Sequence, residues 1–115
     1  MKAVATLLVA AALPASTPRA RVQVVAREFS LALSRPQLRA GRVTIELANF
    51  GEDVHDLRLR RRGGSRTYAI GEVAPGARAE LSTRLAPGRY VLWCSIADHR
   101  ARGMQTVLVV RTRRS

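Results

Sequence analysis

The segment GRYVLWCSIADHRARGM, residues 88 to 104, is the most informative part of this chain. It begins as a short apolar run that ends at Cys94, continues as a polar loop containing His99, and ends at Met104, where a second apolar run, MQTVLVV, begins. The whole chain has 1 cysteine, 2 histidines and 2 methionines including Met1, and this segment holds one of each. It therefore predicts two strands joined by a loop in which possible metal ligands are concentrated.

Outward from this segment, short runs of alternating apolar and polar residues are separated by turn residues. In RVTIELA, residues 42–48, Val43, Ile45 and Leu47 fall on one face, which is typical of a half-buried strand. Further runs occupy 21–26, 28–34, 55–60, 67–70, 77–85, 89–94 and 104–110. No long helix or internal repeat is apparent. The pattern predicts an all-β protein, a Greek-key β-sandwich or barrel of seven to eight strands.

Composition limits the kind of partner that the chain can have. Its 115 residues, 47% of them hydrophobic, suit one compact domain. The formal net charge is +12, and every basic residue except Lys2 is an arginine. So high a charge favours anionic partners, such as an acidic protein surface, anionic lipid or nucleic acid. Aromatic residues are only 4%, which leaves no stacking platform for single-stranded nucleic acid, so no specific nucleic-acid partner is expected.

The N-terminal residues are typical of an export signal. Lys2 precedes an apolar run from Ala3 to Leu13, and Pro14 and small residues follow it. The run is too short to span a bilayer, which needs about 20 apolar residues. We expect residues 1–20 to be a signal peptide and linker, either cleaved or kept as an anchor, and residues 21–115 to be a single exported domain. Its location would be periplasmic, extracellular or on the outer face of a membrane.

Two groups of arginines allow more than one interpretation. Arg58, Arg60, Arg61 and Arg62 form a basic strand edge, which either is simply solvated and discourages pairing between edges or contacts an anionic membrane. Arg100 and Arg102 lie beside His99, where they either dock an acidic redox partner or belong to a solvated surface.

The lone cysteine raises a separate question, because exported proteins normally use cysteines in pairs. An unpaired thiol indicates an intermolecular disulfide, a reactive nucleophile, a metal ligand or a buried small side chain. His55, Cys94, His99 and Met104 together supply two imidazoles, one thiolate and one thioether. In blue-copper sites two histidines and a cysteine form a trigonal plane, with a weak axial methionine. The thiolate favours Cu(I), imidazole serves both oxidation states, and the loose thioether forces neither geometry.

Two segments of the chain resemble the copper-binding segments of the cupredoxins. They are GRYVLWCSIADHRARGM and NFGEDVHDLRL, residues 49–59. The C-x4-H-x4-M spacing is more similar to rusticyanin- and sulfocyanin-type members than to plastocyanin. This resemblance implies a monomeric one-electron carrier with a single type 1 copper ion. The implied ligands are His55, Cys94, His99 and Met104, and His99 would be the port for the electron.

One residue departs from the cupredoxin pattern. Many cupredoxins have Asn or Ser after the first histidine, where this chain has Asp56. We expect the Asp56 backbone N–H still to approach the Cys94 sulfur. The Asp56 carboxylate would favour Cu(II) and lower the reduction potential.

Two other functions remain open, and several enzymes can be excluded by counting. The chain could bind and deliver copper without redox duty, or be a basic β-sandwich that binds an anionic partner. With only 2 histidines it lacks the ligands of a multicopper oxidase, and with 1 cysteine those of a dinuclear copper centre. It has no C-x-x-C-H haem motif. Cys94, His99 and Asp98 match the residue types of a thiol hydrolase, but a loop that ends in Met104 fits metal ligation better. We therefore expect the chain not to be an enzyme.

Overall fold

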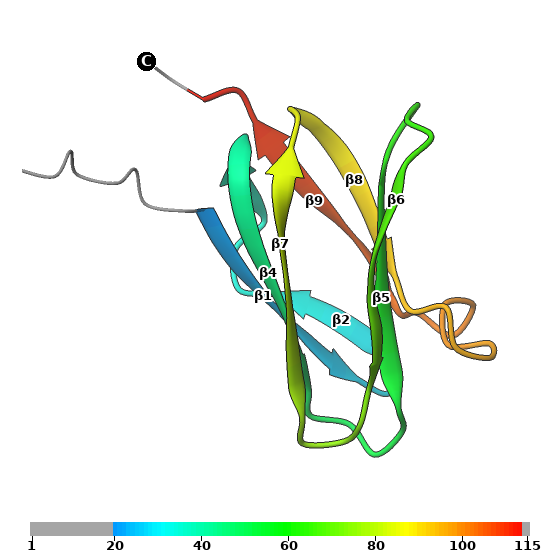
Figure 1. Cartoon of the computed structure of the whole chain (residues 1–115). Helices are drawn as coiled ribbons and strands as arrows, with labels where there is room; N and C mark the ends of the chain where they lie inside the picture. Colours follow the sequence, from blue (N-terminus) through cyan, green and yellow to red (C-terminus); the bar gives the residue numbers. More distant parts are fainter. Residues whose placement is uncertain (1–19, 114–115) are drawn as a thin grey trace, which may run out of the picture.

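The computed structural model describes residues 20–113, which form nine strands in two sheets packed against each other (Figure 1). One sheet contains, in spatial order, β2 (Ser30–Leu33), β1 (Ala20–Arg27), β4 (Gly41–Asn49) and β7 (Arg78–Leu85). The other contains β3 (Gln37–Arg39), β9 (Gln105–Arg111), β8 (Gly88–Trp93), β5 (His55–Arg61) and β6 (Thr67–Val73). The predicted all-β sandwich is confirmed. The expected export segment lies outside the described residues, apart from Ala20.

The ninth strand was not predicted from the sequence. β3 has only three residues, between Pro36 and Ala40, which is too short for an alternating pattern to be visible. It exists because it pairs in parallel with β9, with Leu38 opposite Val110. The Val109 N–H donates to the Pro36 carbonyl at one end of this pairing, and the Ala40 N–H donates to the Arg111 carbonyl at the other. A tertiary contact therefore creates this strand where local propensity alone does not.

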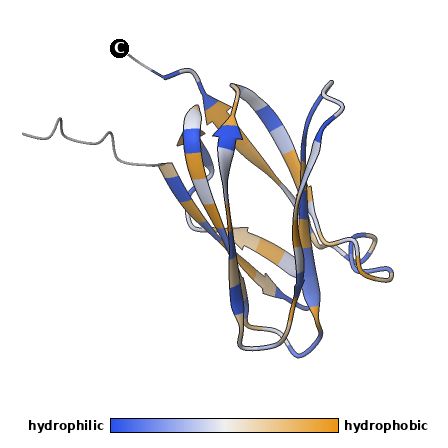
Figure 2. Ribbon diagram, viewed as in Figure 1, coloured by the Kyte–Doolittle hydropathy of each residue, from blue (hydrophilic) through white to orange (hydrophobic). Residues whose placement is uncertain are grey.

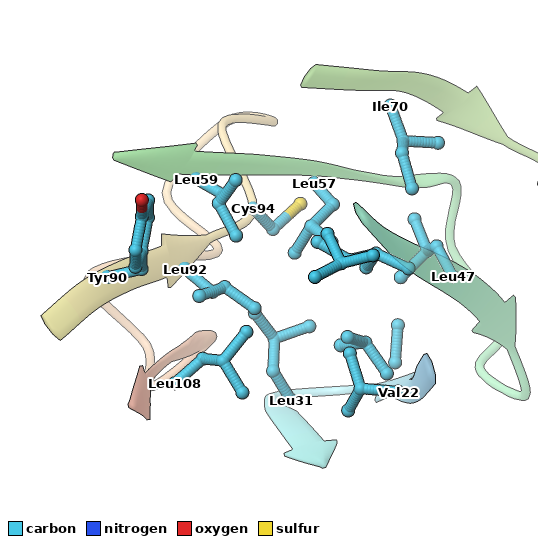
Figure 3. Packing of buried hydrophobic residues seen from close by; sticks show 14 of the residues in the cluster. Val22, Leu31, Leu47, Leu57, Leu59, Ile70, Tyr90, Leu92, Cys94 and Leu108 are labelled. Atoms are coloured by element: carbon cyan, nitrogen blue, oxygen red, sulfur yellow. The ribbon is translucent and has the colours of Figure 1, made fainter. Parts of the chain in front are cut away.

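The core lies between the two sheets and is built from the apolar positions of the alternating strands. Apolar and polar residues alternate along the ribbons in Figure 2, as expected for strands buried on one face. Val22, Val24, Ile45 and Leu47 of the first sheet are fully buried and belong to one core cluster with residues of the second sheet such as Leu92. Figure 3 labels Val22, Leu47 and Leu92 in this cluster. Burying each large apolar side chain stabilises the fold by about 1.5–3 kcal/mol.

The order of the second sheet determines where the candidate ligands lie. β5 and β8 are antiparallel neighbours, with Arg58 opposite Trp93. Since the two strands run in opposite directions, β5 begins and β8 ends at the same end of the sandwich, and this brings His55 close to Cys94. β9 then starts at this end, immediately after Met104.

Within residues 20–113, no helix is long and apolar enough to cross a membrane.

Candidate metal centre

The four candidate ligands come from two connections at one end of the sandwich. His55 is the first residue of β5, Cys94 directly follows β8, and Met104 directly precedes β9. His99 lies in the loop between β8 and β9. All four are buried: His55, Cys94 and Met104 have no exposed surface, and His99 is 7% exposed. Cys94 belongs to the core cluster and is drawn with its sulfur among residues of β5 and β8 in Figure 3.

The three stronger ligands are arranged around a common point. The Cys94 Sγ atom lies 3.9 Å from His55 Nδ1 and 3.6 Å from His99 Nδ1. Ligand atoms of all three residues lie within 4.8 Å of one another. A metal bound at about 2.3 Å by sulfur and about 2.0 Å by imidazole nitrogen, in a trigonal plane, would separate sulfur from nitrogen by roughly 3.7 Å. The His55–Cys94–His99 cluster, with Met104 at the end of the same loop, therefore fits a single type 1 copper site.

Backbone hydrogen bonds hold the loop that carries His99 and Met104. The Cys94 N–H donates to the Met104 carbonyl over 3.1 Å, and the Met104 N–H donates to the His99 carbonyl over 3.0 Å. At Gly103, which has a positive φ of 126°, the loop backbone comes close to the Phe29 carbonyl. A Cβ atom there would lie 2.9 Å from the Phe29 carbonyl oxygen. Glycine at this position lets the loop close against the segment that follows β1.

Burial makes the Cys94 thiolate costly unless a cation is near. Desolvation raises the pKa of the Cys94 thiol above its ordinary value. Hydrogen bonding from the backbone N–H groups of Asp56 and Ile96 acts in the opposite direction and lowers this pKa. A metal ion at this point would supply the positive charge that stabilises the thiolate.

Asp56 ties the beginning of β5 to the ligand loop. Its carboxylate accepts hydrogen bonds from both the backbone N–H, over 2.6 Å, and the hydroxyl of Ser95, the residue after Cys94. Asp56 is only 3% exposed, although it alternates along β5 with the buried residues His55 and Leu57. The reason is that the ligand loop folds over it, with Arg58 Nε 3.6 Å from its carboxylate on the other side.

Two more carboxylates face the histidine rings, and neither was predicted from the sequence. The Glu28 carboxylate lies 3.4 Å from His55 Nε2, and the Asp53 carboxylate lies 3.6 Å from His99 Nε2. Asp53 is two residues from His55 and could have been suspected from that proximity. Glu28 follows β1 and has no sequence relation to His55. Only the parallel pairing of β1 with β4 brings it to the turn that precedes β5.

The surface around the centre combines aromatic rings with arginines. The guanidinium of Arg100 lies 4.6 Å above the Trp93 ring, and that of Arg102 lies 5.0 Å above Phe29. Arg102 also forms a 2.7 Å ion pair with Asp98. Phe50 is 49% exposed in the turn before β5. The two arginines noted beside His99 therefore cover aromatic rings, and one of them is already paired with a carboxylate.

Comparisons with known proteins agree with this geometry. No family model and no curated protein matches the chain. Among solved structures, auracyanin B is similar with a TM-score of 0.66 and 22% identity, over 84% of this chain and 91% of that one. Auracyanin A, a "blue" copper protein from the green thermophilic photosynthetic bacterium Chloroflexus aurantiacus, has a TM-score of 0.62 and 18% identity, over 79% and 98%.

A copper enzyme is also among the similar structures. The copper nitrite reductase of Nitrosomonas europaea matches with a TM-score of 0.60 and 18% identity, over 81% of this chain but only 41% of the enzyme. The likeness is therefore to one part of that larger protein. With its two sheets, its strand order and these structural relatives, the described part of the chain has the cupredoxin fold.

Proposed function

We propose that this chain is a mononuclear type 1 copper protein that carries one electron at a time between redox partners, with His55, Cys94, His99 and Met104 as the copper ligands. One observation carries the proposal: two imidazole Nδ1 atoms lie 3.9 and 3.6 Å from a fully buried cysteine sulfur. Copper held there would supply a one-electron redox couple.

The chain's own residues would keep the ligand geometry constant during electron transfer. His55, Cys94 and Met104 lie at or beside the ends of paired strands, and His99 lies in the loop between two of them. The Asp56–Ser95 contacts and the backbone hydrogen bonds of Cys94 and Met104 limit movement of this loop. Burial of Cys94 and Met104 excludes water from the sulfur ligands. A site that rearranges little between oxidation states exchanges electrons with a low reorganisation cost. His99, at 7%, is the only one of the four with any exposed surface, which suits an electron port.

The main alternative is a protein that stores or delivers copper and does not transfer electrons. The same ligands could store or deliver copper, but a site with three fully buried ligands favours retention over release. Slow loss of copper to a chelator would support the electron carrier, and rapid transfer would support the copper-handling protein.

The other alternative is a basic β-sandwich that binds an anionic partner and in which a bound metal has no function. Nucleic-acid binding that survives Cys94→Ser, in a chain that takes up no copper, would favour that function.

We propose that the chain is not itself an enzyme. The similar nitrite reductase is much longer than this chain. A thiol hydrolase needs a nucleophile that a substrate can reach, whereas the Cys94 sulfur is fully buried. The Asp98 carboxylate, moreover, pairs with Arg102 and not with His99.

Location and partners belong to the same proposal. The apolar run Ala3–Leu13 supports export, with residues 1–20 as signal and linker and residues 21–115 as one monomeric copper domain. Arg100 and Arg102, beside the exposed edge of His99, support docking of an acidic redox partner. The basic strand edge formed by Arg58, Arg60, Arg61 and Arg62 supports a peripheral contact with an anionic membrane.

The deciding experiment is a visible absorption spectrum after addition of Cu(II), with Cys94→Ser measured in parallel. A thiolate bound to Cu(II) gives an intense charge-transfer band that weak surface binding of Cu(II) does not produce. We expect a strong band that disappears with ascorbate, returns on oxidation and is absent from Cys94→Ser. A folded protein with a reduced thiol and no such band would refute the copper assignment and leave the binding of an anionic partner as the leading function.

A further inference from the structure

Glu28 connects the end of β1 to a distant part of the sequence, the turn before β5 and the first residue of that strand. It directly follows β1, and its carboxylate reaches the turn between β4 and β5. There Oε1 accepts hydrogen bonds from the backbone N–H groups of Glu52, over 2.7 Å, and Asp53. The same oxygen lies 3.4 Å from His55 Nε2. One carboxylate therefore braces the turn that leads into β5 and faces the first residue of that strand.

The contact matters because the far nitrogen of His55 is enclosed. His55 has no exposed surface, and among the described residues its Nε2 atom has no hydrogen-bond partner within normal geometry. Glu28 is the carboxylate that faces it. A neutral imidazole that presents a free Nδ1 to a metal must carry its proton on Nε2. A buried N–H without an acceptor costs about 1–3 kcal/mol, and the Glu28 carboxylate is placed to accept it.

Gly51 leaves the space that this carboxylate occupies. A Cβ atom at Gly51 would collide with the side-chain oxygens and Cδ of Glu28. The Gly51 N–H is held by the side chain of Asn49, so the backbone here is fixed as well. The backbone N–H groups of Glu52 and Asp53 both donate to this carboxylate, which fixes its place beside the ring. The turn is thus shaped around a negatively charged group beside His55.

We propose that Glu28 is a positioning residue of the copper centre, which orients His55 with Nδ1 toward Cys94 and places a fixed negative charge behind that ring. This inference rests on the proposed copper function. A carboxylate that accepts from a ligating histidine makes the imidazole a stronger donor. Stronger donation and a nearby negative charge both stabilise Cu(II) more than Cu(I). Glu28 therefore sets a reduction potential lower than the same site would have with a neutral side chain.

The test compares Glu28→Gln with Glu52→Gln. Both variants remove one negative charge at the same turn, but the Glu52 side chain is exposed and makes no hydrogen bond or ion pair within residues 20–113. The midpoint potential and the Cu(II) affinity are measured by spectroelectrochemistry and chelator competition. For Glu28→Gln we expect a retained charge-transfer band, a raised potential and a Cu(II) affinity about 10- to 100-fold lower. Glu52→Gln should resemble the wild type in all three.

A second readout needs no copper and survives failure of the proposed function. In the metal-free protein, the proton of His55 is located by ¹⁵N NMR of the imidazole. We expect Nε2–H in the wild type, and a mixture with Nδ1–H in Glu28→Gln, whose amide can either accept or donate. A wild type without the copper band would refute the copper function while this tautomer result still tests Glu28.

The outcomes separate a positioning residue from a simple brace of the turn. A brace alone would lower the unfolding temperature of Glu28→Gln without moving the potential or the tautomer. Unchanged potential and unchanged tautomer relative to Glu52→Gln would overturn the proposal. If Glu28→Gln does not fold, Glu28→Asp keeps the charge but shortens its reach. The shorter side chain should then still show the lower Cu(II) affinity, and a wild-type affinity and tautomer would overturn the proposal.

Discussion

At the scale of single residues, the candidate centre is surrounded by carboxylates in a chain whose net charge is +12. Glu28 faces His55, Asp53 faces His99, and Asp56 holds Ser95 beside Cys94. Glu28 and Asp56 are largely shielded from water, whereas Asp53 is about half exposed. Shielded charges are screened least, so carboxylates this close to a bound copper ion would favour Cu(II) over Cu(I).

Asp56→Asn should raise the reduction potential while keeping the charge-transfer band. Asparagine can still accept the Ser95 N–H through Oδ1, so the loop stays anchored, but the buried negative charge is lost. Cyclic voltammetry measures the effect. The control is Asp98→Asn, which removes an exposed carboxylate from the same loop and should change the potential far less. Equal shifts in the two variants would mean that net charge, and not the position of Asp56, sets the potential.

Met104→Leu should keep the intense band and raise the potential. Leucine has a similar volume, so the cost in stability should stay below about 1.5 kcal/mol. It would, however, remove the thioether that we propose as a weak copper ligand favouring Cu(II). Leu92→Met makes the reverse exchange in the core and should leave the potential unchanged. A potential that does not respond to Met104→Leu would show that this thioether is not a ligand.

At the scale of elements, the geometry depends on two connections that meet at one end of the sandwich. The β4–β5 turn presents His55, and the β8–β9 loop presents Cys94, His99 and Met104. The loop is closed by its own backbone hydrogen bonds and by the close approach of Gly103 to Phe29. Small changes at this approach should therefore be felt at the ligands.

Gly103→Ala should destabilise the protein by about 1–3 kcal/mol and speed the loss of copper to a chelator. The added Cβ meets the Phe29 carbonyl at 2.9 Å, and φ is 126°. Gly63→Ala is the matched control, since Gly63 also has a positive φ, 77°, but nothing lies within 4 Å of its added Cβ. Both should lower the denaturant midpoint, whereas only Gly103→Ala should accelerate copper release. Equal rates of copper release in the two variants would show that the backbone at Gly103 does not control how long the metal is retained.

Tyr90 provides a prediction on pH that concerns β8 and not the ligands. Its hydroxyl donates to the Ala86 carbonyl over 2.8 Å, and burial raises the pKa of Tyr90 above its ordinary value. The unfolded chain would ionise this residue first, so the contribution of Tyr90 is complete below about pH 10 and is lost as the pH rises beyond it. Tyr90→Phe should cost about 1 kcal/mol near neutral pH and should lose less stability on going to alkaline pH, as followed by urea unfolding. A parallel decline in both proteins would contradict this role.

At the scale of the whole molecule, charge is segregated along the strands. Exposed arginines gather at the end opposite the ligands, and we call this group the basic end; it consists of Arg39, Arg42, Arg61, Arg62, Arg84, Arg89 and Arg111. None of them forms an ion pair with a carboxylate within residues 20–113. The carboxylates lie toward the ligands or in the middle of the first sheet. β1 starts at the basic end, so the N-terminal segment joins the domain there (Figure 1).

This segregation predicts that the basic end, and not the ligand end, contacts an anionic membrane. Changing Arg39, Arg42, Arg84 and Arg89 to Gln should weaken binding to phosphatidylglycerol vesicles by a hundredfold or more, at about 1 kcal/mol per arginine. The control changes Arg27, Arg78, Arg100 and Arg102 to Gln, which alters the net charge equally at the other end. Vesicle sedimentation of the full chain measures both. Equal losses would mean that binding follows net charge alone.

Much of this protein was predictable from local sequence patterns. Alternation along strands such as β4 gives an all-β sandwich, because which face of a strand is buried depends on residues two positions apart. The types and spacing of Cys94, His99 and Met104 indicate copper, because they lie in one short loop. Their assignment as ligands remains a prediction until a metal is observed.

The tertiary structure alone decided which groups stand behind the ligands. Glu28 meets His55, β3 forms beside β9, and Asp56 is buried beneath the ligand loop only because particular strand ends become neighbours in space. The basic end likewise appears only when the strand directions are known. Local spacing can therefore indicate the fold and the copper-type ligand set of this chain. The contact of Glu28 with His55 joins residues far apart in sequence, and it depends on how the two sheets are ordered and packed.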